Sequence, residues 1–217
     1  MIRLMIFDCD MTIVDSSYTI TENFNMMADV LGRPHVTRDQ VMRCIANPLR
    51  QLCEILLGDY RPEWNDLYQG NTAIVEPKLL RPFPETVPAL TRLREMGVTL
   101  AVASNREDPR PGLERTGLAP LFDAMTGGNG LDGGPRLPYK PDPAMLNALL
   151  ARFNIPADQA VYIGDADIDM ETARAADMRG IGVTYGNFKA AQLTALGAWR
   201  VIDSLEELPG IVAAVAP

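Results

Sequence analysis

The chain begins with a short apolar segment that ends in two carboxylates. Residues 2–7 are almost all apolar, which is typical of a strand buried on both faces of a sheet. Asp8 follows directly and Asp10 comes two residues later. Two carboxylates at the end of a buried strand are costly unless a cation or a proton offsets their charge. We therefore predict a functional site at this point of the chain.

Further apolar segments alternate with amphipathic helical segments along the rest of the chain. Five of them are predicted to be strands, at residues 98–103, 122–126, 161–164, 181–185 and 199–202. Strands that alternate with helices are typical of βαβ units. The pattern predicts an α/β fold with a doubly wound parallel sheet.

One long segment departs from this alternation. Residues 16–81 show helical periodicity with no strand among them, and Thr37 with Gln40 three positions later forms a capping box. This composition favours a small helical bundle inserted after the first strand. We assign residues 1–15 and 82–217 to an α/β core and residues 16–81 to the insert.

Composition and charge argue against several classes of protein. The chain has 217 residues and a net charge of -8, which argues against a protein that binds the phosphate backbone of nucleic acids. No segment approaches the roughly 20 apolar residues of a membrane-spanning helix. The apolar run before Asp8 is too short for a signal peptide, so we expect a cytoplasmic protein without membrane contacts.

Cysteine and histidine usage excludes several chemistries. Cys9, Cys44 and Cys53 are odd in number and lack metal-ligand spacing, which indicates reduced thiols. His35 is the only histidine, so Ser-His-Asp triads, Cys-His pairs and histidine-rich zinc sites are nearly excluded. The chemistry must then depend mostly on carboxylates.

Polar side chains stand after several predicted strands and on one loop. They are Asp8, Asp10, Ser104, Asn105, Lys140, Asp165 and Asp169. The carboxyl ends of parallel strands share one edge of a sheet, so these groups can converge. Ser104 and the backbone N–H groups of Asn105 and Arg106 could hold phosphate oxygens, and Lys140 could pair with a carboxylate and a phosphoryl group. Asp8 and Asp165 would hold Mg²⁺, which takes oxygen ligands.

Each of these residues also has a purely structural interpretation. Ser104 can be a helix cap, Lys140 a solvated loop lysine, and Asp169 a charge at a helix N-terminus. The order and position of all of them together favour a site.

Four short motifs resemble those of the haloacid dehalogenase superfamily of phosphohydrolases. They are residues 8–12 (DCDMT), Ser104 after a strand, Lys140-Pro141, and residues 164–169 (GDADID). Residues 127–187 look most like the phosphoglycolate phosphatase-like branch, and the helical insert lies where that branch carries its cap domain. The resemblance covers nearly the whole chain.

The resemblance implies a role for each motif residue. Asp8 would be the nucleophile that accepts the phosphoryl group, and Asp10 would protonate the leaving oxygen and then activate water. Ser104 and Lys140 would stabilise the phosphoryl oxygens. Asp8, the backbone carbonyl of Asp10, and Asp165 would bind Mg²⁺, and Asp169 would hold the metal or its waters.

The motifs also depart from the family pattern. Met11 stands where the family usually has glycine, Ala166 replaces a frequent serine, and Asp167 adds an acid. Cys9 should point away from the site by strand alternation. Asp10 is the acid that the dehalogenase branch lacks, so its presence favours a phosphate ester as substrate.

The cap is expected to select the substrate. Arg43, Asn47 and Arg50 are our candidates for gripping a second anionic group, and a helical cap leaves room only for a small phosphorylated metabolite. The expected function is an Mg²⁺-dependent phosphatase, with 2-phosphoglycolate among the candidate substrates, acting as a monomer or homodimer. A sugar phosphomutase and a catalytically idle protein that binds a phosphorylated ligand or a protein partner are the alternatives.

Overall fold

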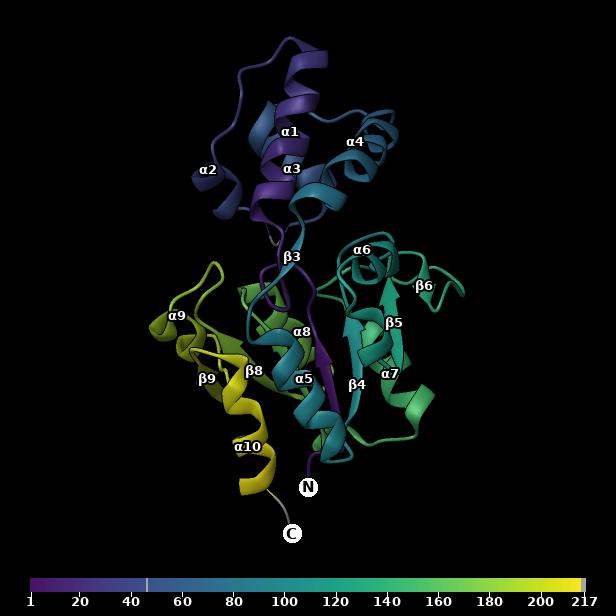
Figure 1. The fold of residues 1–217 in the computed structure, drawn as a ribbon, viewed down its shortest axis with the longest axis vertical. Helices are drawn as coiled ribbons and strands as arrows, with labels where there is room; N and C mark the ends of the chain where they lie inside the picture. The colour runs from purple at the N-terminus through teal and green to yellow at the C-terminus, as the bar shows by residue number, and fades with distance from the viewer. Residues whose placement is uncertain (46, 216–217) are drawn as a thin grey trace.

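The computed structural model describes residues 1–45 and 47–215. Figure 1 shows two lobes: a larger one built around a sheet, which contains both chain ends, and a smaller helical one at the opposite end of the long axis. Residues 17–45 and 47–79 form the helical lobe. The carboxyl end of the first strand points towards the junction of the two lobes.

The larger lobe is organised around a seven-stranded sheet. Its order is β6-β5-β4-β1-β7-β8-β9. The strands are β1 (Leu4–Phe7), β4 (Thr99–Ala103), β5 (Ala124–Gly127), β6 (Gly130–Leu131), β7 (Ala160–Gly164), β8 (Arg179–Val183) and β9 (Arg200–Ile202). All neighbouring pairs are parallel except β5 and β6. The predicted α/β fold with a parallel sheet is confirmed, and the antiparallel β6 is an addition to it.

Alternate residues of the central strand face two separate hydrophobic clusters. Met5 and Phe7 of β1 pack in the cluster that includes α5 and α10, while Leu4 and Ile6 pack in the cluster that includes α7 and α8. The helices of this lobe are α5 (Thr86–Glu95), α6 (Arg110–Arg115), α7 (Ala144–Phe153), α8 (Asp167–Ala175), α9 (Ala190–Ala195) and α10 (Leu208–Ala214). Short 3-10 turns lie at Ala119–Leu121, Ala157–Gln159 and Leu205–Glu207. Burial on both faces explains why the strands read as continuous apolar segments.

The helical lobe has a hydrophobic cluster of its own. Its helices are α1 (Ser17–Leu31), α2 (Arg38–Met42), α3 (Leu49–Leu57) and α4 (Trp64–Leu79). The capping box of Thr37 and Gln40 opens α2 as predicted. Two connections join the lobe to the core, and they pair as the antiparallel strands β2 (Val14–Asp15) and β3 (Arg81–Pro82). The assignment of residues 16–81 to a separate cap domain stays our proposal.

One residue of the loop after β1 packs inside the helical lobe. Met11 has a backbone φ of 60°, in the left-handed region that glycine adopts most easily. Its side chain is 2% exposed and belongs to the hydrophobic cluster of helices α1 to α4. The loop that follows β1 is therefore anchored to the helical lobe by the side chain of Met11.

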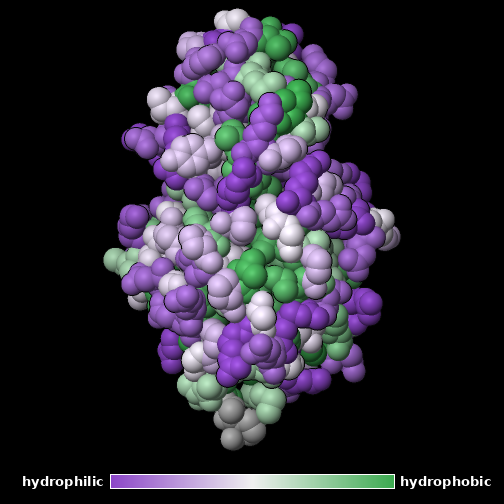
Figure 2. All heavy atoms as spheres, in the orientation of Figure 1, coloured by the Kyte–Doolittle hydropathy of each residue, from purple (hydrophilic) through white to green (hydrophobic). Residues whose placement is uncertain are grey.

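One face of the molecule is mainly hydrophilic. Figure 2 shows hydrophilic residues over most of this face, with hydrophobic ones gathered near the middle of the larger lobe and on one side of the helical lobe. No helix within residues 1–45 and 47–215 combines the length and apolar composition that crossing a bilayer requires.

Candidate active site

The three central strands bring the predicted motif residues to one edge of the sheet. Asp8 directly follows β1, Ser104 directly follows β4, and Asp165 directly follows β7. These strands are neighbours in the sheet and run in the same direction. All three residues are buried, with 6% or less of their surface exposed. The sheet topology thus produces the convergence that the sequence pattern indicates.

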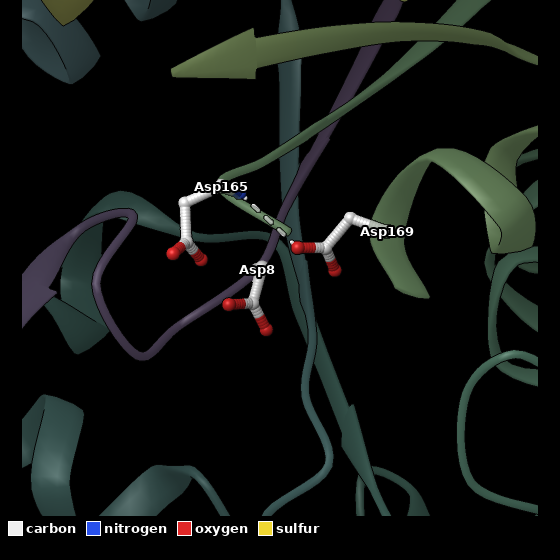
Figure 3. Close-up of side chains that lie close together, drawn as sticks. All are labelled: Asp8, Asp165 and Asp169. Carbon is white, nitrogen blue, oxygen red and sulfur yellow. Dashed lines mark hydrogen bonds between the residues drawn. The ribbon is translucent and has the colours of Figure 1, made fainter. Parts of the chain in front are cut away.

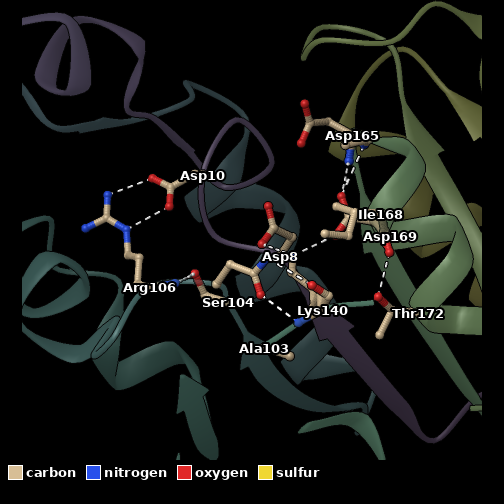
Figure 4. A network of polar contacts seen from close by, with 12 residues as sticks. Asp8, Asp10, Ala103, Ser104, Arg106, Lys140, Asp165, Ile168, Asp169 and Thr172 are labelled. Atoms are coloured by element: carbon tan, nitrogen blue, oxygen red, sulfur yellow. Dashed lines mark hydrogen bonds and ion pairs between the residues drawn. The ribbon is translucent and has the colours of Figure 1, made fainter. Parts of the chain in front are cut away.

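Lys140 lies at the centre of this cluster (Figure 4). Its ammonium group donates hydrogen bonds to Asp8 Oδ1 at 2.6 Å, Asp169 Oδ1 at 2.7 Å and the Tyr162 hydroxyl at 3.0 Å. Lys140 is 4% exposed, so the interpretation as a solvated loop lysine is wrong. Burial alone would lower the pKa of Lys140, but Asp169 and Asp8 outweigh it and keep the pKa well above its usual value. The ammonium group therefore stays charged.

Asp8, Asp165 and Asp169 form a compact group of carboxylates (Figure 3). An oxygen atom from each lies within 4.8 Å of the others. Burial raises the pKa of Asp8 to about 7, against the opposing effect of Lys140. Burial and the nearby Asp169 carboxylate raise the pKa of Asp165 well above its usual value. One ammonium group cannot neutralise three carboxylates, so the donor set fits a hard divalent cation.

The hydrogen bonds divide these carboxylates into two kinds. Asp169 Oδ2 accepts the backbone N–H groups of Asp165 and Ala166 at 3.1 Å each, while its Oδ1 accepts from Lys140 and the Tyr162 hydroxyl. Asp8 and Asp165 each use one oxygen for a hydrogen bond within the described chain, to Lys140 and to the Asn187 N–H. Their second oxygens are better placed than those of Asp169 to bind a metal.

Asp10 faces an arginine from the loop after β4. Arg106 Nε donates to Asp10 Oδ2 at 2.8 Å and Arg106 Nη2 donates to Asp10 Oδ1 at 2.7 Å, as Figure 4 shows. Burial alone would raise the pKa of Asp10, but the guanidinium of Arg106 outweighs it and holds that pKa below its usual value. Arg106 in turn pairs with Glu76 of α4.

The loop that carries Ser104 is held by its own hydrogen bonds. The Arg106 backbone N–H donates to Ser104 Oγ at 3.1 Å, so it is not free for a phosphate oxygen as we had expected. Ser104 thus makes a contact within the loop and does not cap α6, whose N-cap is Pro109. The Asn105 side chain accepts the Lys140 backbone N–H at 2.8 Å. Asn105 therefore ties the Lys140 loop to the end of β4.

A cleft of about 300 Å³ lies between the two lobes. Arg43, Asn47 and Gln51 line it from the helical lobe, and Lys140 lines it from the core together with Asp167. Arg50 is not among its lining residues; it is largely exposed and pairs with Glu54 on its own helix at 3.0 Å. Of the three predicted cap contacts, the structure thus places Arg43 and Asn47 at the cleft and Arg50 outside it.

Some residues of the network carry no signal in the sequence. Tyr162 lies within an apolar strand and resembles an ordinary core residue. Glu76 is one polar residue among many on α4. For Arg106 the sequence predicts a role of the backbone N–H group and none of the side chain. Its local signal is a charged side chain two positions after Ser104.

Comparisons with known proteins find similar hydrolases along almost the entire chain. The sequence model described as "Haloacid dehalogenase-like hydrolase" matches residues 5–183. A phosphoglycolate phosphatase of Vibrio parahaemolyticus is 28% identical over 99% of this chain and 98% of the relative. A plasmid-encoded phosphoglycolate phosphatase of Cupriavidus necator is 30% identical over 96% of this chain and 92% of the relative. 

The solved structures give the same result for the fold. The crystal structure of a haloacid dehalogenase-like hydrolase from Bacteroides fragilis has a TM-score of 0.86 and 28% identity, and the match covers 96% of this chain and all of the other. A β-phosphoglucomutase from Thermotoga maritima has a TM-score of 0.75 and 24% identity over 99% of this chain and all of the other, which shows the fold alone.

Proposed function

Since this chain belongs to the haloacid dehalogenase-like hydrolase family, we propose that it hydrolyses the phosphate monoester of a small metabolite through an aspartyl phosphate on Asp8, with Mg²⁺ as cofactor. The enzyme is a phosphoric monoester hydrolase, like the phosphoglycolate phosphatases that it matches along almost its entire length. The observation that carries the proposal is the buried cluster of Asp8, Asp165, Asp169 and Lys140 at the sheet edge.

The carboxylates of Asp8 and Asp165 would hold Mg²⁺, together with the backbone carbonyl of Asp10. Asp169 would orient Lys140 and the loop after β7, since its oxygens already accept four hydrogen bonds. Bound Mg²⁺ supplies positive charge that offsets the carboxylates and the phosphoryl oxygens.

The residues of the chain would carry out two displacements. Asp10, which Arg106 keeps ionised in the free protein, first takes up a proton as the substrate binds. An oxygen of Asp8 then attacks phosphorus, and the bond to the leaving oxygen breaks as Asp10 gives that oxygen a proton. Water then attacks the phosphorus of the aspartyl phosphate and gives a proton to Asp10, and the bond to Asp8 breaks. Inorganic phosphate leaves and both carboxylates return to their starting state. The Ser104 hydroxyl would donate to a phosphoryl oxygen in both steps, and the Lys140 ammonium beside Asp8 would offset the negative charge of the phosphoryl group.

Substrate choice would depend on the cleft between the lobes. Arg43 is a cation from the helical lobe at this cleft, and a metabolite such as 2-phosphoglycolate carries a carboxylate that it can bind. We expect Arg43→Ala to raise the KM for 2-phosphoglycolate about tenfold or more while leaving that for p-nitrophenyl phosphate nearly unchanged. Arg50→Ala is the matched control, because Arg50 lies on the neighbouring helix outside the cleft. Equal effects of the two substitutions would contradict a role for Arg43.

The test is the release of inorganic phosphate from a panel of small phosphate esters that includes 2-phosphoglycolate. We expect release that needs Mg²⁺ and that Asp8→Asn abolishes, because the amide is nearly isosteric but cannot form the acyl phosphate. Melting curves of Asp8→Asn show whether it remains folded. If the folded wild-type protein with Mg²⁺ releases phosphate from no ester, the proposed function is wrong.

A further inference from the structure

The geometry points to Arg106 as a positioning residue that fixes the carboxylate of Asp10, and to Glu76 as the group that fixes Arg106 from the helical lobe. The inference rests on the proposed function in one respect, since it takes Asp10 to be the acid and base of the reaction. It adds two residues, from the loop after β4 and from α4, to the groups on which that reaction depends.

The contact between Arg106 and Asp10 determines the orientation of the carboxylate. Two nearly parallel hydrogen bonds, of 2.8 and 2.7 Å, join the guanidinium to both oxygens of Asp10. A bidentate pair of this kind fixes the plane of a carboxylate as well as its position. The two side chains are 17% and 20% exposed, so little water competes for these bonds. Asp10 is therefore not free to rotate about its side-chain bonds while the pair persists.

Glu76 holds the other side of the same guanidinium. It is 2% exposed and lies in the last turns of α4, close to the connection β3 that leads back to the core. Its Oε1 pairs with Arg106 Nη1 and its Oε2 pairs with Arg115 Nη1 at 2.7 Å. All three nitrogens of Arg106 thus bind carboxylates, one on the reactive loop and one on the helical lobe. The orientation of Asp10 is tied to the position of α4.

The contact with Arg106 is important because Asp10 takes part in both displacements. Asp10 has to meet the leaving oxygen in the first displacement and water in the second, and a carboxylate held in place loses less entropy in each. Removal of Arg106 should slow the steps that transfer a proton. It should have little effect on the first displacement of p-nitrophenyl phosphate, because p-nitrophenolate leaves without being protonated.

The decisive experiment compares Arg106→Gln with wild type on an alkyl phosphate ester and on p-nitrophenyl phosphate. We expect the kcat for the alkyl ester to fall about thirtyfold with KM changed by less than about threefold. With p-nitrophenyl phosphate we expect a rapid first turnover followed by a slow steady state, because the aspartyl phosphate then accumulates. Arg106→Lys keeps one charge between the two carboxylates and should restore part of the lost kcat.

Arg115→Gln is the matched control for a general loosening of the two lobes. It removes the second ion pair of Glu76 but touches neither Asp10 nor the guanidinium of Arg106. Its kcat should stay within about twofold of the wild-type value. If Arg115→Gln and Arg106→Gln lower kcat equally, or if Arg106→Gln raises kcat, the positioning role is wrong.

A double-mutant cycle separates this inference from the proposed function. In an Asp10→Asn background, Arg106→Gln should cause almost no further loss of kcat, since Arg106 acts through Asp10. Full additivity of the two losses would overturn the inference while leaving the phosphatase proposal intact. If Asp10→Asn itself leaves the alkyl-ester kcat unchanged, the role of Asp10 in the proposed mechanism is wrong, and the inference falls with it. Melting curves and the p-nitrophenyl phosphate burst confirm that each variant is folded.

Discussion

At the scale of single residues, hydrogen bonds fix the position of the buried Lys140 ammonium group in the site. Among the described residues, the Lys140 ammonium has three hydrogen-bond partners, and one of them is the uncharged hydroxyl of Tyr162. That hydroxyl also lies 3.1 Å from the carbonyl oxygen of Ala103, which competes with Asp169 Oδ1 for its single proton. Tyr162 therefore connects the Lys140 group to the end of β4 and limits where the ammonium can move.

We predict that Tyr162→Phe lowers kcat about tenfold and the free energy of unfolding by about 1–3 kcal/mol, because one N–H of the buried ammonium loses its acceptor. KM should change little, since the hydroxyl faces Lys140 rather than the cleft. Steady-state kinetics and denaturant unfolding measure the two effects. Tyr139→Phe is the control, because it also removes one tyrosine hydroxyl, which bonds to Glu107 away from Lys140. A Tyr162→Phe enzyme with wild-type kcat would contradict the prediction.

The residues at the strand ends could be predicted because topology alone brings them together. Asp8, Ser104 and Asp165 each follow a recognisable strand, and parallel strands share one edge. The pairing of Arg106 with Asp10 and Glu76 could not be predicted, because it joins residues 96 and 30 positions apart. Such contacts depend on how the helical lobe packs against the core. The local periodicity of the sequence does not predict this packing.

At the scale of elements, the helical lobe is held together chiefly where α1 meets α4. The Asn23 side chain of α1 donates to the Tyr68 carbonyl at 3.0 Å and to Thr72 Oγ1 at 2.8 Å. The rings of Phe24 and Tyr68 pack with their centroids 5.7 Å apart. Asn23 is 1% exposed, so these hydrogen bonds are made in the lobe interior.

We predict that Asn23→Ala destabilises the pair α1 and α4 by about 1–3 kcal/mol, because buried backbone and hydroxyl groups lose a partner. Hydrogen exchange should become faster in these two helices and stay unchanged in α5 and α10. Asn65→Ala removes an exposed hydrogen bond to Tyr60 in the same lobe and should leave exchange unaltered. Uniform acceleration across both lobes would show that Asn23 does not act locally.

Element length decided which parts of the fold the sequence could predict. The buried strands and the capping box of α2 have enough residues to show a pattern. Strands β2, β3 and β6 have two residues each, so they cannot show an alternation. They form because tertiary contacts bring two chain segments together.

At the scale of the whole molecule, the buried carboxylates link metal binding, pH and stability. The pKa of Asp8 is about 7 in the folded protein, above the value near 4 of an exposed aspartate. The folded state therefore binds this proton more tightly than the unfolded state. In the metal-free protein, the contribution of Asp8 to the free energy of unfolding must fall as the pH rises from about 4 to about 7.

We predict that the Tm of the chelated wild-type protein decreases relative to that of chelated Asp8→Asn over this pH range. Mg²⁺ should raise the wild-type Tm more at pH 8 than at pH 5, because ionised carboxylates bind it. Thermal unfolding with and without chelator measures both effects. A Tm difference between wild type and Asp8→Asn that is constant from about pH 4 to 7 would show that Asp8 does not titrate in this range.

Met11 contributes to the interior of the helical lobe, although it lies outside residues 16–81. Its backbone belongs to the reactive loop, yet its side chain fills space among the helices of the smaller lobe. An excised helical segment would lack this side chain and contain a hole in its interior. Exchange of helical lobes between related enzymes, as a way to transfer specificity, should therefore carry residue 11 along with residues 16–81. The segment to exchange would then begin inside the loop that follows Asp8.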